Sequence, residues 1–232
     1  SMLGTITVSA TTTIDLSAGN CITFNQSANT TVAFANTSTA MDITLVRKPL
    51  VEFTSGSVDF DANDSLSIPD DDDFVLGNTF TIEMFVRITN VDSFRTIFKQ
   101  GYSYSSGYYM IAKTDNKFQF HDYATSTSIE SAAVIKEGQT DYQHIALVCN
   151  SGTAQWYVDG VASGSSGSIN LTTNLTDDPR MGAMDGGATW NYLGDISNFR
   201  ITKAAVYTSN FTPPLGALTN ITNTILLCCQ SS

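Results

Sequence analysis

Short runs of alternating apolar and polar residues, separated by glycine, asparagine, aspartate and serine, dominate this chain. The clearest run spans residues 80–88, with apolar side chains on one face and Thr81, Glu83 and Arg87 on the other. That period of two is typical of a half-buried antiparallel strand. Helical periodicity is nearly absent, and the pattern predicts at most one helical turn, at residues 204–206. The sequence therefore predicts an all-β, antiparallel β-sandwich.

Two hairpins are predicted from turn residues between such runs. Trp156 and Val158 alternate with polar neighbours, and the following Asp159-Gly160 pair predicts a type I′ turn. A second hairpin joins residues 109–111 to residues 118–120 across the polar stretch 113–116.

A change in composition near Arg47, Lys48 and Pro49 divides the chain. Residues 1–48 are rich in Thr, Ser, Ala and Asn and contain few large apolar side chains. Such a segment is too small to hold a strong core alone. We predict a small β segment at residues 1–48 for assembly or docking, and one sandwich domain at residues 49–232.

The charge balance limits the partners. Lys and Arg number 11 against 22 Asp and Glu, a formal net charge of -11. Nucleic-acid binding begins with neutralising phosphates, so we expect no nucleic-acid partner. No run of about 18 apolar residues occurs, so we expect no membrane insertion. The four cysteines fit no metal motif, and we interpret them as reduced core thiols of a protein assembled in a cytoplasm.

Three blocks, at residues 58–88, 143–160 and 194–214, resemble in order and spacing the laminin-G-like members of the concanavalin-A-like lectin/glucanase superfamily. The first contains VDFD and LSIP, the second QHIALV and WYVDG, and the third GDISNFR and YTSNFTPP. The resemblance covers roughly residues 50–229 and implies a jelly-roll sandwich. A structural role is enough to explain most residues of these blocks. We expect His144 to be a buried histidine and Gly160 and Gly194 to lie in turns. The expected core includes Phe60, Leu66, Ile68, Trp156 and Phe199.

The closing form, YTSNFTPP followed by LLCCQS, looks most like domains in structural proteins of marine tailed bacteriophages. Residues 28–47 are similar to short β modules of phage fibre and appendage proteins. The resemblance implies a non-enzymatic virion structural protein, a fibre or appendage module on the virion surface that attaches to a host-surface glycan or protein. Other virion proteins and copies of the chain would be partners, with a trimer expected for a fibre. The alternatives are a capsid- or tail-decorating domain without a ligand and a bacterial extracellular carbohydrate-binding module.

Calcium is the cofactor that the resemblance suggests, although we expect none to be required. In many relatives an acidic residue of the closing block contributes a ligand, and here Ser197 and Asn198 stand at those positions. Ca²⁺ takes six to eight oxygen ligands. The oxygens that remain for a calcium site belong to Asp61, Asn63, Asp64 and Asp195.

We expect no catalysis, with a glycan-cleaving enzyme that uses an aspartate-only pair as the third alternative. Glycoside hydrolases place two carboxylates on either side of the scissile bond, whereas the glutamates here, at positions 52, 83, 130 and 137, lack an acidic neighbour at such spacing. No G-x-S-x-G nucleophile motif occurs.

Two loops carry the side chains that sugar binding requires, an aromatic platform together with polar hydrogen-bonding groups. A tyrosine-rich stretch at residues 100–109 also suits an adaptable protein-binding surface, and a second candidate loop spans residues 185–192. The alternative is that their aromatic side chains cover the edges of the core. The candidate ligand-binding residues are Tyr102, Tyr104, Tyr108, Asp185, Trp190, Asn191 and Tyr192.

Overall fold

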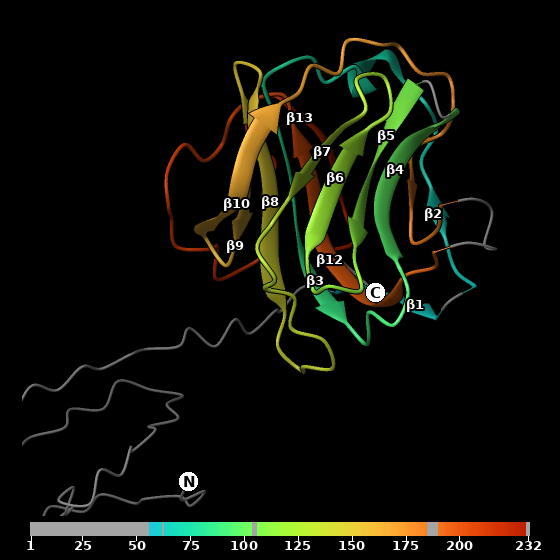
Figure 1. Ribbon diagram of the computed structural model, residues 1–232, viewed down its shortest axis with the longest axis vertical. Helices are drawn as coiled ribbons and strands as arrows, with labels where there is room; N and C mark the ends of the chain where they lie inside the picture. The colour runs from blue at the N-terminus through green and yellow to red at the C-terminus, as the bar shows by residue number, and fades with distance from the viewer. Residues whose placement is uncertain (1–55, 62, 104–105, 185–189, 231–232) are drawn as a thin grey trace, which may run out of the picture. The chain divides into compact units, whose positions relative to one another are not determined.

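The computed structural model describes residues 56–61, 63–103, 106–184 and 190–230. These residues form two antiparallel sheets packed face to face, and the predicted all-β sandwich is confirmed (Figure 1). The predicted β segment at residues 1–48, and its boundary, lie outside the described residues. No helix in the described part is long and apolar enough to cross a membrane.

One sheet has seven strands in the order β1-β12-β3-β8-β9-β10, with β13 also paired to β12. Its strands are β1 (Val58–Asp61), β3 (Phe80–Ile88), β8 (Gln143–Asn150), β9 (Thr153–Val158), β10 (Val161–Ser168), β12 (Leu193–Thr202) and β13 (Thr224–Cys228).

The other sheet has six strands in the order β2-β11-β4-β5-β6-β7, and its outer face looks toward the viewer in Figure 1. Its strands are β2 (Leu66–Ser67), β4 (Arg95–Ser103), β5 (Ser106–Ala112), β6 (Phe118–Asp122), β7 (Thr127–Glu130) and β11 (Arg180–Met181).

The core fills the space between the two sheets. Phe60, Trp156 and Phe199 are buried there, as predicted, and Ile68 packs against the same cluster. Leu66 does not, because it lies on the two-residue strand β2 and remains 36% exposed. The expectation that Leu66 is a core residue is therefore wrong.

Strand β3 is buried on both faces, which corrects the prediction of a half-buried strand. Thr81 and Glu83 are fully buried although they point away from the core. The segment between β12 and β13 covers them: the carbonyl of Ala204 accepts a hydrogen bond from Thr81 Oγ1 at 2.7 Å, and the Tyr207 hydroxyl donates to Glu83 Oε2 at 2.8 Å. The single helical turn predicted in this segment is absent; a 3-10 turn, η1, lies instead at Asp72–Phe74.

Both predicted hairpins are confirmed. β5 pairs with β6, and β9 pairs with β10. Asp159 and Gly160 have φ angles of 50° and 78°, which the type I′ turn requires. The turn also anchors the covering segment, because the Gly160 carbonyl accepts a 2.9 Å hydrogen bond from the Phe211 amide.

We expect Gly160→Ala to destabilise the domain by about 2–3 kcal/mol. A Cβ atom there would lie 2.0 Å from the Phe211 carbonyl oxygen, in addition to the cost of positive φ. Gly138→Ala is the matched control, since Gly138 also has positive φ but its added Cβ would meet nothing closer than 3.8 Å. Urea titration of both variants should show about 1 kcal/mol for the control; equal losses would mean that the contact with Phe211 does not matter.

Candidate functional site

The outer face of the six-stranded sheet gathers side chains that the core does not use. Along β5, Tyr108 and Met110 face the core cluster, so Tyr109 and Ile111 between them face outward. The pairing register aligns six outward positions in one row across the sheet, from Ser67 through Arg180, Lys99, Tyr109 and His121 to Ser128.

Five aromatic rings form a continuous group on this face, called here the aromatic platform. The rings of Tyr109 and His121 are stacked with centroids 5.1 Å apart, and Tyr123 packs edge-on against both, at 5.5 and 4.8 Å. Trp190 continues the group, 6.1 Å from Tyr109 and 4.9 Å from Phe94. Tyr109 is buried beneath its neighbours, and the other four rings are half-buried.

Local backbone structure holds Trp190 at the edge of the sheet. Its φ of 53° lies in the left-handed region, and its carbonyl accepts a 2.7 Å hydrogen bond from the amide of Thr96 on β4. The Arg95 guanidinium donates to the carbonyl of Asn191 at 3.1 Å. A residue in a sparsely populated conformation persists where its surroundings fix it, so the indole is held in place rather than free to collapse onto the core.

The platform is uncharged at neutral pH. Burial lowers the pKa of His121 below its ordinary 6.5, against a smaller opposing effect of Asp122. The Nδ1 atom of His121 lies 2.8 Å from the Ser128 hydroxyl. Burial, together with Tyr123, raises the pKa of Tyr109 to about 12. Neutral rings beside hydroxyl groups can stack on the apolar face of a sugar while polar atoms at the rim take its hydroxyls.

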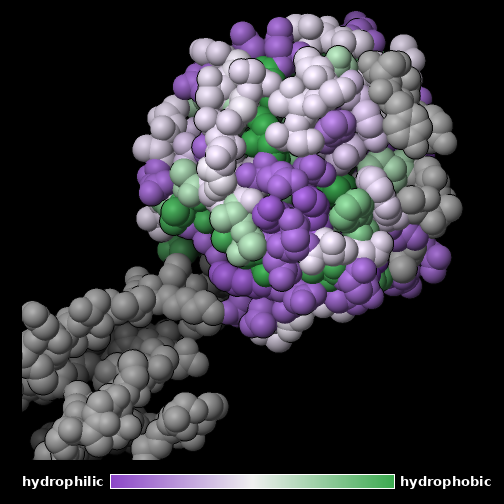
Figure 2. Space-filling model, in the orientation of Figure 1, coloured by the Kyte–Doolittle hydropathy of each residue, from purple (hydrophilic) through white to green (hydrophobic). Residues whose placement is uncertain are grey.

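Charged residues lie beside the platform at the end of β7 and in the turn between β5 and β6. Glu130 accepts hydrogen bonds from Lys113 at 2.6 Å, Lys117 at 3.3 Å and Gln119 at 3.2 Å, and Asp115 pairs with the same lysines. Hydrophilic side chains accordingly gather in the middle of this face (Figure 2). Such half-buried pairs at the surface add little stability but keep the surroundings of the platform polar.

Of the side chains predicted to bind a ligand, Trp190 belongs to the platform on this face, and both Trp190 and the following Asn191 are half-buried. Tyr192 is fully buried in the core, and its ring packs edge-on against Phe60. Tyr108 is 3% exposed, and its hydroxyl donates to Gln100 Oε1 at 3.1 Å. Neither ring is placed to contact a ligand on the surface. The side chain of Tyr102, and all of Tyr104 and Asp185, lie outside the described residues.

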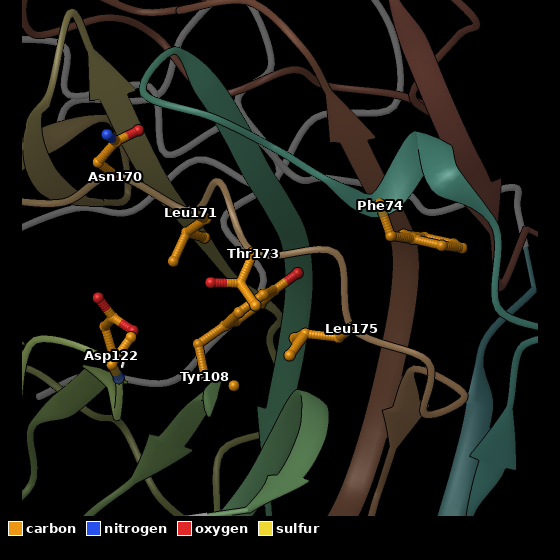
Figure 3. A pocket seen from close by; sticks show the side chains of 9 residues that line it. Phe74, Tyr108, Asp122, Asn170, Leu171, Thr173 and Leu175 are labelled. Atoms are coloured by element: carbon orange, nitrogen blue, oxygen red, sulfur yellow. Dashed lines mark hydrogen bonds between the residues drawn. The ribbon is translucent and has the colours of Figure 1, made fainter. Parts of the chain in front are cut away.

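Tyr108 instead lines a small cavity between the strand ends and the loops above them. Figure 3 shows Tyr108, Asp122, Leu171, Thr173 and Leu175 around it. Its volume of about 20 Å³ holds roughly one water molecule. Ligand pockets measure some hundreds of Å³, so this cavity does not accommodate a sugar.

Three of the four predicted calcium ligands, Asp61, Asn63 and Asp64, lie in one turn. Asp61 and Asp64 are exposed and bond to backbone amides of their own turn, at 3.4 and 3.2 Å. Asp195 is buried on β12, and its Oδ2 atom accepts a 2.8 Å hydrogen bond from Arg87 Nε. Within the described ranges, no group of three or more His, Cys, Asp or Glu side chains is arranged for a metal ion. Calcium binding stays a prediction, tested by thermal melts with Ca²⁺ and with chelator.

The candidate residues chosen from the sequence include neither Phe94, His121 and Tyr123 nor Tyr109, although Tyr109 lies in the tyrosine-rich stretch. A usable signal was present: once residues 109–111 and 118–120 are paired as a hairpin, Tyr109 and His121 fall on the same outward face. The outer sheet face therefore combines neutral aromatic rings with polar and charged side chains beside them.

Comparison with known proteins identifies the family of the chain. The sequence model of the concanavalin A-like lectin/glucanases superfamily matches residues 60–209, and the chain belongs to this family. No curated protein matches the sequence.

Solved structures share the fold at low sequence identity. Domain 4 of the extracellular arabinanase AbnA from Geobacillus stearothermophilus, in complex with arabinotriose, matches with a TM-score of 0.51 and 16% identity over 65% of this chain and 72% of that one. The CBM40 domain of a Ruminococcus gnavus sialidase, bound to α2,3 sialyllactose, matches with a TM-score of 0.52 and 9% identity. The match covers 66% of this chain and 92% of that one. A candidate carbohydrate-binding protein from Bacteroides ovatus matches with a TM-score of 0.50 and 14% identity. The match covers 66% of this chain but only 44% of that protein.

Proposed function

We propose that this domain binds glycans on the outer face of its six-stranded sheet. The observation that carries the proposal is the aromatic platform, five contiguous rings that the core does not require. The three structural neighbours support it, since two are domains solved with a bound oligosaccharide and the third is a candidate carbohydrate-binding protein.

The proposed activity is binding without turnover. Each glutamate in the described part of the chain has a structural contact: Glu83 is buried with Arg200, Glu130 pairs with two lysines, and Glu137 Oε2 accepts from the Val91 amide. The described glutamates therefore do not supply the pair of carboxylates that most retaining or inverting hydrolases place across a glycosidic bond.

The proposed setting is a surface-attachment module. The phage-like closing block at residues 207–231 supports a virion fibre or appendage that attaches to a host-surface glycan, with other virion proteins and copies of the chain as partners. The structural neighbours favour a second setting, an extracellular carbohydrate-binding module of a bacterium. The molecular mass in solution distinguishes these two settings. A fibre module with residues 1–48 present is expected to be a trimer.

Trp190→Ala is expected to weaken glycan binding about 10- to 100-fold, because one or a few aromatic contacts typically supply most of the binding energy. The labelled protein is applied to an array of bacterial surface glycans, and affinity for the strongest ligand is measured by titration. Leu215→Ala removes an exposed apolar side chain from the segment outside the other sheet and is the matched control. An array without saturable binding, or equal affinity for all three proteins, would overturn the proposal.

A further inference from the structure

Arg180 lacks the ion pair that each of the other described arginines makes. Arg87 pairs with Asp195, Arg95 with Asp92 and Arg200 with Glu83. Among the residues that the structure describes, no carboxylate lies within ion-pair distance of Arg180. Its Nε–H is shielded from solvent and donates no hydrogen bond.

An arginine without a partner is unexpected here, since acidic residues outnumber basic ones by 22 to 11. Asp178, two residues before it, is engaged elsewhere: Oδ1 accepts from the Asp70 amide at 3.0 Å and Oδ2 from the Ser67 hydroxyl at 3.4 Å. A buried donor without an acceptor lowers stability, and such groups in native proteins call for an explanation other than stability.

The sheet register places Arg180 beside the proposed glycan site. Arg180 is directly opposite Lys99, which is opposite Tyr109. Two strand spacings of about 4.8 Å each put the Arg180 position roughly 10 Å from the centre of the platform. Two linked sugar rings can bridge that span. Lys99 adds a second positive charge between Arg180 and the platform, and its ammonium group donates to the Gly101 carbonyl at 3.2 Å.

We propose that the ligand is an acidic glycan, with one sugar ring on the aromatic platform and its carboxylate or sulfate on the Arg180 guanidinium. This inference rests on the proposed glycan binding. The planar guanidinium presents parallel donors that match both anionic groups. Binding supplies the anionic partner that Arg180 lacks among the described residues, and it selects against neutral glycans of the same backbone.

Matched pairs of probes test the inference and separate the two anionic groups. Sialyllactose is compared with lactose, polygalacturonate with its methyl ester, and κ-carrageenan with its desulfated form. For the wild-type protein, the charged member of at least one pair is expected to bind 10-fold or more tightly, with affinity falling as salt rises. Arg180→Gln is expected to lower that affinity about 10- to 100-fold and to leave affinity for the neutral member unchanged.

Two controls keep the result specific. Lys117→Gln removes a positive charge from the same face, where Lys117 pairs with Asp115 and Glu130, and is expected to keep the preference for the charged probe. The melting temperature of Arg180→Gln is expected to stay the same or rise, because the residue loses no partner.

The outcomes distinguish the inference from the function on which it rests. Glycan binding that requires Trp190 but shows no preference within any pair, or a preference that survives in Arg180→Gln, overturns the acidic ligand and leaves glycan binding intact. A blank array together with no binding to any probe overturns both.

Discussion

Replacing Glu83 by glutamine is expected to destabilise the domain by about 3–5 kcal/mol, the usual cost of leaving one partner of a buried ion pair uncompensated. Glu83 is fully buried on β3. Its Oε1 atom accepts from Arg200 Nε at 2.9 Å, and its Oε2 atom lies 3.2 Å from His144 Nε2 and 2.8 Å from the Tyr207 hydroxyl. The neutral amide of the variant cannot balance the buried charge of Arg200.

The same contacts give the loss a pH dependence. Burial raises the pKa of Glu83, but the hydrogen bond with His144 and the charge of Arg200 outweigh it and hold the pKa below the ordinary 4.5. A lowered folded-state pKa contributes stability above the unfolded-state value, and this stability is lost as pH falls through the folded-state value. The difference in unfolding free energy between wild type and Glu83→Gln should therefore be largest at neutral pH and should become smaller below about pH 4.5.

Urea titration at pH 7 and at pH 3 measures both effects. Glu130→Gln is the matched control, because Glu130 pairs with lysines at the surface and should cost less than about 1 kcal/mol. A Glu83 variant that costs no more than this control would contradict a structural role for the buried network.

Replacing Trp156 by alanine is expected to cost about 3–5 kcal/mol. Its indole is fully buried between the sheets, and its Nε1 atom donates to the Ile129 carbonyl on β7 at 3.0 Å. Alanine would leave both a cavity and a buried carbonyl without a donor. Trp156→Phe keeps most of the volume and should cost about 1–3 kcal/mol, chiefly from the unsatisfied carbonyl.

The second tryptophan provides the control. Trp190 is half-buried on the outer face and touches Phe94 and Tyr109, so Trp190→Ala should cost about 1 kcal/mol or less while impairing glycan binding. Thermal and urea unfolding compare the two variants. Equal losses of stability would place Trp190 in the core and remove it from the proposed site.

The sheet architecture was predictable because the relevant signals are local. Alternation and turn residues predicted the strand over residues 80–88 and the hairpin that closes at Gly160, and both are present. The burial of Glu83 was not predictable in this way. The segment that covers it carries no periodicity, and its contacts join residues more than 100 positions apart, such as Thr81 with Ala204.

The candidate site was predictable only in part, for a related reason. Loop composition pointed to Trp190, but it pointed equally to Tyr108 and Tyr192, which the structure buries. Whether a tyrosine faces inward or outward depends on register, and a shift of one residue exchanges Tyr108 for Tyr109. The isolation of Arg180 depends on the absence of neighbours in space, which no sequence pattern reports.

Acrylamide quenching of tryptophan fluorescence tests the central claim most directly. The chain has two tryptophans; Trp156 is fully buried, so accessible quenching reports on Trp190. A saturating amount of the glycan that binds most tightly on the array is expected to protect Trp190 from acrylamide, with no such change in Trp190→Phe. Saturable glycan binding that leaves the quenching of Trp190 unchanged would contradict the account and place the glycan elsewhere on the domain.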